Sequence, residues 1–116
     1  MGRMYRAVVV SANGRSEMTV AFVDTGADET IISNRIAKRL RLKLYGEYKA
    51  LSASRHKIIG SLASVKISDS VISDKMVVGV TDEPFGTDYV DEEGVEVILG
   101  IDFLQRNDLK LDFSKS

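Results

Sequence analysis

The fold of this chain is decided by the stretch Val20-Ala21-Phe22-Val23-Asp24-Thr25-Gly26-Ala27. Its first four residues are apolar and have the composition of a buried β-strand, whereas Asp-Thr-Gly has the composition of a tight turn. A carboxylate at the end of a buried strand is oriented and partly removed from water, so its protonation can be tuned in a way that a freely solvated carboxylate does not allow. Asp24 is therefore the first candidate for a functional residue.

A second apolar run, Val97-Ile98-Leu99-Gly100, ends in glycine and is followed by Ile101-Asp102-Phe103-Leu104. An isolated Asp-Thr-Gly is weak evidence, because Asp and Gly are ordinary turn residues. The two motifs together, in this order and at this spacing, resemble the retropepsin-like aspartic protease family. There, an Asp-Thr-Gly-Ala loop carries the catalytic aspartate, and an apolar strand ending in glycine and a short helix support that loop. The resemblance extends over about residues 18 to 113.

Length and composition limit the possible architectures. The chain has 116 residues, enough for one domain with a sizeable core and too few for two, so we expect a single domain over residues 1–116. The 44% hydrophobic and 28% charged residues are typical of a globular protein. There is no cysteine, which excludes disulfides and thiolate metal sites.

Charge and hydropathy bear on partners and location. The formal net charge of −1 gives no general attraction to nucleic acid or to an anionic membrane. No stretch approaches the ~20 apolar residues that span a bilayer, and the N-terminus lacks the apolar core of a secretory signal. We therefore expect a cytoplasmic protein with no membrane partner, no nucleic-acid partner and no cofactor.

Local patterns predict a hairpin and a short helix. Two β-prone runs, 4–11 and 18–23, flank Asn13-Gly14, which is a strong hairpin signal, so these strands should be antiparallel neighbours. After the aspartate loop, apolar residues recur at helical spacing, and Ser33 stands at the N-cap position. The sequence therefore predicts an amphipathic helix over 34–41.

The remaining chain is mostly β-prone. Many short strands with one or two short helices indicate a mainly β, barrel-like domain. With the resemblance, this predicts an all-β acid-protease half-barrel of six to eight strands whose active site is formed by a two-fold homodimer. The further predicted strands are 47–53, 57–67, 75–80, 95–99 and 109–113.

The chemistry of amide hydrolysis requires a strong nucleophile and an acid for the leaving nitrogen. The chain has one histidine and no cysteine, but two carboxylates that share one proton can activate a water and return the proton. A single Asp-Thr-Gly supplies one carboxylate, and a two-fold dimer would set Asp24 opposite its symmetry mate. The resemblance implies this arrangement, with Asp24, Thr25 and Gly26 as the catalytic residues. It also implies that the Thr25 hydroxyl reaches the partner loop, while Gly26 lets backbone approach the pair closely.

The resemblance also implies a peptide-binding cleft. Asp28 falls where the family binds the backbone of an extended peptide, and Glu29 lies beside it. A β-hairpin flap over the substrate is expected from residues 47–59, with its tip at 52–56. The implied substrate-binding residues are Ala27, Asp28, Glu29, Ser52, Ala53 and Ser54.

Two features depart from the viral members of the family. The flap tip has no glycine, and Ile101-Asp102 stands where viral members have Arg-Asn. An apolar-Asp pair followed by an apolar residue and Leu is more similar to non-viral domains, including the DNA-damage-inducible family. The cellular branch is therefore predicted.

Other motifs have ordinary interpretations. Asp102 is expected to cap a short helix over 103–106. His56 is expected to be exposed or on the flap, and the acidic stretch 82–93 lacks the spacing of an EF-hand loop. The basic residues Arg35, Lys38, Arg39, Arg41 and Lys43 should form a solvated helix face and not a nucleic-acid patch.

The predicted function is hydrolysis of internal peptide bonds in extended polypeptides by an aspartic endopeptidase. The alternative is a module of the same fold that binds peptides or dimerises with little or no cleavage, because a fold does not guarantee activity. A nucleic-acid-binding β-barrel is a weaker alternative, because the net charge is slightly negative and the aromatic residues form no stacking cluster.

Overall fold

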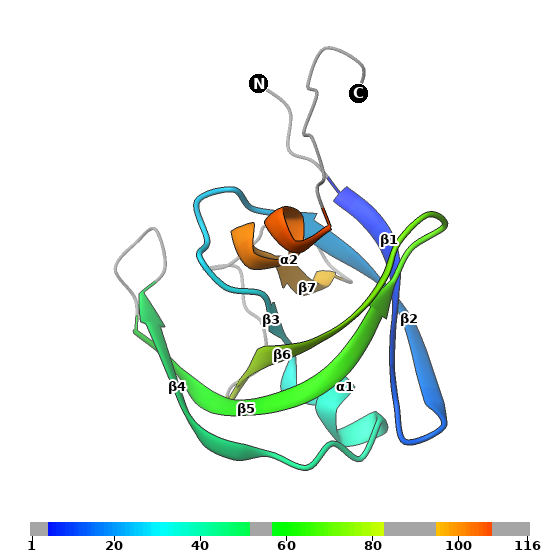
Figure 1. Cartoon of the computed structure of the whole chain (residues 1–116). Helices are drawn as coiled ribbons and strands as arrows, with labels where there is room; N and C mark the ends of the chain where they lie inside the picture. Colours follow the sequence, from blue (N-terminus) through cyan, green and yellow to red (C-terminus); the bar gives the residue numbers. More distant parts are fainter. Residues whose placement is uncertain (1–4, 52–56, 83–94, 108–116) are drawn as a thin grey trace.

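The computed structural model describes residues 5–51, 57–82 and 95–107, and the description below is confined to them. Within these ranges the chain forms a mainly β fold with two short helices (Figure 1). The strands are β1 (Tyr5–Ala12), β2 (Arg15–Val23), β3 (Ile31–Ile32), β4 (Tyr45–Leu51), β5 (Lys57–Ser68), β6 (Ser73–Thr81) and β7 (Val95–Leu99). The helices are α1 (Asn34–Arg39) and α2 (Ile101–Arg106).

The strands belong to one sheet with the order β1-β2-β7-β3-β6-β5-β4. Because β1 also pairs with β5, the sheet closes into a barrel, and β4 extends it beyond β5. Most neighbours are antiparallel, but β2 runs parallel to β7, and β3 runs parallel to β6. The predicted mainly β, barrel-like class is confirmed, and the parallel β2–β7 pair brings together the ends of the two apolar runs identified in the sequence.

The first hairpin forms as predicted. Asn13 and Gly14 both have positive φ angles, 56° and 71°, and connect β1 and β2 as a two-residue turn with Ala12 opposite Arg15. The Asn13 side-chain amide also donates to the carbonyls of Leu40 and Arg41, at 3.0 and 2.9 Å. The Asn13 side chain therefore pairs two carbonyls just after the last residue of α1, where a helix leaves its carbonyls without a partner of its own.

Helix α1 begins at the predicted residue and ends earlier than predicted. The Ser33 hydroxyl accepts a hydrogen bond from the Ile36 amide at 3.2 Å, so the predicted N-cap is confirmed. The helix ends at Arg39 and not at residue 41, because Leu40 is its C-cap and Arg41 has a φ of 54°. The two-residue strand β3 was not predicted, because it is too short to show any periodicity.

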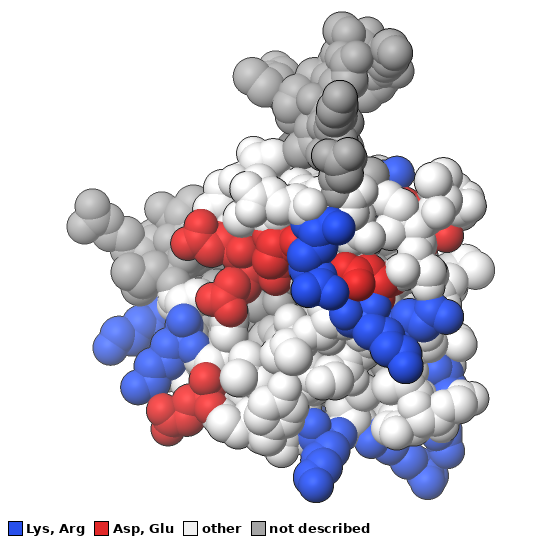
Figure 2. Space-filling model, viewed as in Figure 1, with Lys and Arg blue, Asp and Glu red and all other residues white. Residues whose placement is uncertain are grey.

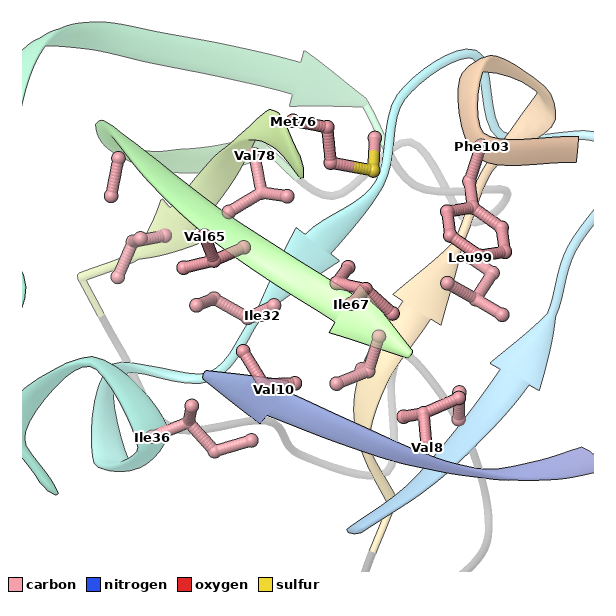
Figure 3. Packing of buried hydrophobic residues seen from close by; sticks show 14 of the residues in the cluster. Val8, Val10, Ile32, Ile36, Val65, Ile67, Met76, Val78, Leu99 and Phe103 are labelled. Atoms are coloured by element: carbon pink, nitrogen blue, oxygen red, sulfur yellow. The ribbon is translucent and has the colours of Figure 1, made fainter. Parts of the chain in front are cut away.

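The core fills the inside of the barrel (Figure 3). Along β5 most buried residues alternate with more exposed ones, as expected when one face of a strand points inward. Phe103 and Leu104 of α2 join this core at 1% and 2% exposure, so the helix is held against the barrel by apolar burial. Other members of the cluster are Val8, Val10, Ile32, Ile36, Val65, Ile67, Val78 and Leu99.

Several predictions concern the surface or lie outside the described residues. The five residues of the predicted basic helix face are all exposed, as expected, but Arg41 and Lys43 lie beyond the end of α1. Arg35 and Arg39 form ion pairs with Glu96 and Glu17. The two described helices have six residues each, and neither is long and apolar enough to cross a membrane.

Some predictions lie outside the described residues. They concern the flap tip, His56, residues 83–93 of the acidic stretch and the strand 109–113.

An ion pair fastens the end of α2 to β6. The Arg106 guanidinium donates to both carboxylate oxygens of Asp74 at 2.9 and 3.0 Å, and the Asn107 side chain donates to the same carboxylate at 3.1 Å. The hydrogen bond from Arg106 is the largest cause that lowers the pKa of Asp74, while partial burial acts in the opposite direction. A carboxylate with a lowered pKa in the folded state stabilises the fold above its ordinary pKa, and loses that effect as pH falls through the lowered value.

We therefore expect Asp74→Asn to lower the free energy of unfolding by a constant amount between neutral pH and about pH 5. Below that range the difference from wild type should shrink, because protonation removes the same charge from the wild-type pair. Urea unfolding at a series of pH values measures this difference. A difference that stays undiminished at the acid end would contradict the assigned role of the Asp74 charge.

Candidate active site

Asp24 lies directly after β2, where the strand breaks into a tight turn. Its backbone amide donates to the Leu99 carbonyl at 3.0 Å, which continues the parallel pairing of β2 with β7 by one residue. The turn is closed by a hydrogen bond from the Ala27 amide to the Asp24 carbonyl at 3.1 Å. The Asp24 loop, residues 24–29, is thus anchored to the barrel at the residue that carries the carboxylate.

The loop's own backbone orients the Asp24 carboxylate. The Gly26 amide donates to Asp24 Oδ1 at 2.9 Å. A Cβ atom added at Gly26 would lie 3.3 Å from the same oxygen, which is a tight contact, so glycine allows the amide to approach. Asp24 is half-buried, whereas Thr25 and Gly26 are exposed at the turn. The Gly26 amide therefore orients the Asp24 carboxylate, and the neighbouring residues Thr25 and Gly26 are accessible at the surface.

The start of α2 supports the loop from the other side. The Ile101 amide donates to the Ala27 carbonyl at 2.8 Å, and the Asp102 amide donates to the Asp28 carbonyl at 3.3 Å. A Cβ atom added at Gly100 would lie 2.5 and 2.6 Å from the carbonyl carbon and oxygen of Glu29. The loop therefore rests directly on Gly100, which confirms the expectation that the glycine-ended strand and the helix support it.

Asp102 has a different role from the one predicted. The helix begins at Ile101 with Gly100 as its N-cap, so the expectation that Asp102 caps a helix over 103–106 is wrong. Its carboxylate does accept a hydrogen bond from the Phe103 amide at 2.7 Å, but the other partners belong to Thr30. The Thr30 hydroxyl donates to Asp102 Oδ1 at 2.7 Å and the Thr30 amide donates to Oδ2 at 3.0 Å.

Thr30 was missed by sequence reasoning. It is fully buried, and its hydroxyl accepts a hydrogen bond from the Gly100 amide at 3.0 Å. A threonine between an acidic pair and two isoleucines carries no periodic signal, and its partners lie about 70 residues later in the chain. The only hint in the sequence that Thr30 has a buried polar partner is Asp102, an acidic residue in an otherwise apolar segment.

A small apolar cluster lies between the Asp24 loop and the β4–β5 hairpin. It consists of Ile31, Tyr48, Ile58 and Ile98, with Ala27 of the loop packed against it. Strands β4 and β5 are antiparallel neighbours up to the pair of Leu51 with Lys57, as the predicted flap hairpin requires. The base of this hairpin is therefore attached to the loop through apolar contacts, while Ser52, Ala53 and Ser54 lie outside the described residues.

The Asp24 loop carries two exposed acidic residues, Asp28 and Glu29. Figure 2 shows acidic side chains gathered near the middle of the view, with Lys and Arg side chains around them. Within the described residues, no group of three or more His, Cys, Asp or Glu side chains has an arrangement that could hold a metal ion. The described residues of the loop and its supports offer carboxylates, hydroxyls and backbone amides for chemistry.

Comparison with known proteins places this geometry in a family. The model of the family described as "gag-polyprotein putative aspartyl protease" matches residues 8–106. The chain belongs to the retropepsin-like aspartyl protease family. The match includes both the Asp24 loop and the Gly100 segment, so the family recognised from the two motifs is confirmed.

Cellular and viral proteins are similar to this chain in sequence or in fold. The DNA damage-inducible protein 1 of Candida glabrata is 31% identical over an alignment of 102 residues, gaps included, and the match covers 83% of this chain and 21% of that protein. The chain thus spans about a fifth of the length of this curated relative. The retroviral protease-like domain of Ddi1 from Leishmania major superposes with a TM-score of 0.54 at 19% identity, over 96% of this chain and 80% of that one.

A viral protein of similar fold is the EIAV protease complexed with the inhibitor HBY-793. It superposes with a TM-score of 0.65 at 21% identity, and the match covers 96% of this chain and 93% of that chain. At these identities the two solved structures support the fold, and the sequence relative supports the cellular branch. The retropepsin-like fold and its resemblance to the DNA-damage-inducible branch are therefore both confirmed.

Proposed function

We propose that this retropepsin-like protein is an aspartic endopeptidase that hydrolyses internal bonds of extended polypeptides as a two-fold homodimer. The observation that carries the proposal is the half-buried Asp24 carboxylate, held by the Gly26 amide beside an exposed turn. One such carboxylate per chain is half of the pair that the reaction requires. A two-fold axis at the exposed Thr25-Gly26 turn supplies the other half.

The proposed mechanism uses the Asp24 pair as both base and acid. With one proton shared between the two carboxylates, the ionised one takes a proton from water as the water attacks the peptide carbonyl. The protonated one donates to the carbonyl oxygen, and a proton is then returned to the leaving nitrogen. Thr25 would hold the two loops together through its hydroxyl, and the Gly26 amide keeps each carboxylate oriented.

Substrate binding is assigned to the residues beside this pair. The main chain of residues 27–29 and the exposed carboxylates of Asp28 and Glu29 would contact an extended peptide, with Ala27 beside them, and the peptide offers its own amides and carbonyls. The β4–β5 hairpin would cover the peptide, with Ser52, Ala53 and Ser54 at its tip, and exclude water from the reaction. The apolar cluster around Tyr48 and Ile58 would keep the base of the hairpin in place.

The test of activity is incubation of the purified protein with a mixed peptide library over a range of pH, followed by mass spectrometry. We expect cleavage within peptides, blocked by a pepstatin-type transition-state analogue or by another inhibitor of the Asp pair. Peptide binding without cleavage at any pH would instead support a binding module of the same fold.

The proposed homodimer leads to a separate prediction about how activity depends on protein concentration. Since each chain supplies one Asp24 loop, the cleaving species should sediment as a dimer, and specific activity should fall when dilution dissociates it. Analytical ultracentrifugation at the concentrations used for cleavage measures the species present. Full activity in a sample that sediments as a monomer would overturn the proposed intersubunit pair.

A further inference from the structure

We infer that Thr30 and Asp102 act together as positioning residues, a buried hydroxyl and carboxylate that hold the Asp24 loop in its reactive geometry. The inference rests on the proposed function where it is tested by cleavage kinetics. Its second test, by hydrogen exchange, needs no cleavage. Neither residue is proposed to touch the substrate or the reacting water. Their effect is transmitted through Gly100 and its two neighbours in the chain.

Thr30 uses all of its polar groups in this arrangement. Its amide and hydroxyl both donate to Asp102, its hydroxyl accepts from the Gly100 amide, and its carbonyl accepts from the Gly79 amide at 3.0 Å. With 0% of its surface exposed, no bulk water can replace a lost partner. Removal of the hydroxyl would therefore leave buried polar groups unsatisfied, which is far more costly than the loss of an exposed hydrogen bond.

The segment held by Thr30 contacts both ends of the turn that carries Asp24. Leu99, directly before Gly100, accepts the hydrogen bond from the Asp24 amide, and Ile101, directly after it, donates to Ala27. A displacement of Gly100 would move both anchors together. The hydrogen bond from Gly100 to Thr30 is therefore placed where it fixes the position of the Asp24 carboxylate relative to the barrel.

Asp102 is suited to this task as an anion. Three donors converge on its two oxygens: the Thr30 hydroxyl and the Phe103 amide on Oδ1, and the Thr30 amide on Oδ2. An asparagine has one acceptor oxygen, so in either orientation its NH₂ group would face a backbone N–H. Asp102→Asn therefore keeps the size of the side chain and still disrupts the arrangement.

The kinetic test compares Thr30→Val, Thr30→Ser, Asp102→Asn and a control. Thr30→Val keeps the shape and removes the hydroxyl, whereas Thr30→Ser keeps the hydroxyl. Asp74→Asn is the matched control, because the carboxylate of Asp74 accepts hydrogen bonds from Arg106 and Asn107 at the far end of the same helix. All four variants are compared with wild type by kcat and KM on one cleaved peptide and by thermal unfolding.

We expect Thr30→Val and Asp102→Asn to lower kcat by roughly 10- to 100-fold with a smaller change in KM, because a misplaced catalytic group slows the chemical step. Thr30→Ser should keep most of the activity, and Asp74→Asn should keep wild-type kcat despite its lower stability. The double variant of Thr30 and Asp102 should lose less than the product of the single losses, since both changes break one arrangement. Equal kcat in Thr30→Val and Asp74→Asn would overturn the inference.

The second test does not depend on cleavage. Hydrogen exchange should become faster at the amides of Gly26, Ala27 and Gly100 in Thr30→Val and Asp102→Asn, while the β1–β2 hairpin stays protected. Unchanged exchange at these amides would also overturn the inference. If wild type cleaves nothing, the proposed function fails and exchange still decides the positioning role. If Thr30→Val does not fold, Asp102→Asn and Thr30→Ser decide it.

Discussion

Asp24→Asn protein should fold, dimerise and lose essentially all peptide cleavage, by roughly 10²- to 10⁴-fold or more, because an amide cannot take the proton of the attacking water. The change keeps the shape of the side chain, and its oxygen can still accept the hydrogen bond from the Gly26 amide. Cleavage of a single peptide substrate, followed with thermal unfolding of the same samples, measures the effect.

The matched control for this prediction is Asp82→Asn, because Asp82 is an exposed carboxylate directly after β6 and has no assigned role at the site. It should keep wild-type activity. If the Asp24→Asn protein retains a tenth or more of the activity, a different group must activate the water. If it is inactive but unfolded, Asp24→Ser offers a smaller polar replacement for the same comparison.

Gly100→Ala should have the second largest effect. The added Cβ would lie 2.5 Å from the carbonyl carbon of Glu29 and 2.9 Å from the carbonyl oxygen of Ala27, so the loop or the helix must move. Gly100 has a φ of −88° and a ψ of −178°, which alanine adopts freely, so the effect is steric and not one of backbone strain. We expect a loss of about 1–3 kcal/mol in the free energy of unfolding. The loss of activity should be larger than that instability explains, because the displaced loop carries Asp24.

Gly14→Ala is the control for Gly100→Ala. Gly14 has a φ of +71° and nothing within 4 Å of an added Cβ, so alanine there destabilises the fold through backbone strain alone, by about 1–2 kcal/mol. It lies in the turn of the first hairpin, away from the Asp24 loop. Its activity at a temperature where it is folded should equal that of wild type. Equal stability and activity of Gly100→Ala and wild type would contradict the close contact at Gly100.

The parts of the fold that were predicted correctly have local signals. The Asn13-Gly14 turn, the cap at Ser33 and the alternating pattern of the longer strands depend on residues close in sequence, so one sequence is enough to find them. The two halves of the site were also found, because each combines an apolar strand with a turn or a glycine. Their contact across the parallel β2–β7 pair followed from the family resemblance and not from local patterns.

The parts that were missed depend on partners far away in the chain. The strand β3 has two residues and exists because it completes the sheet between β6 and β7. Aspartate is a residue type that often caps helices, so the sequence around Asp102 predicts a cap. Nothing near it in the sequence shows that its carboxylate accepts a hydrogen bond from Thr30, 72 residues earlier. Thr30 is an ordinary residue type, and its sequence neighbours do not mark it. It becomes fully buried, with all of its hydrogen-bonding groups paired, only when the barrel closes.

The central claim is that two Asp24 carboxylates, one from each subunit, act as one unit. It is tested most directly by mixing wild-type and Asp24→Asn proteins at constant total concentration and measuring cleavage after full subunit exchange. A mixed dimer has one carboxylate and one amide, so it lacks the shared proton and should be inactive. If the mutation leaves dimer affinity unchanged, we predict that activity falls as the square of the wild-type fraction. A straight line through the origin would show that each subunit works alone, and would contradict the intersubunit pair.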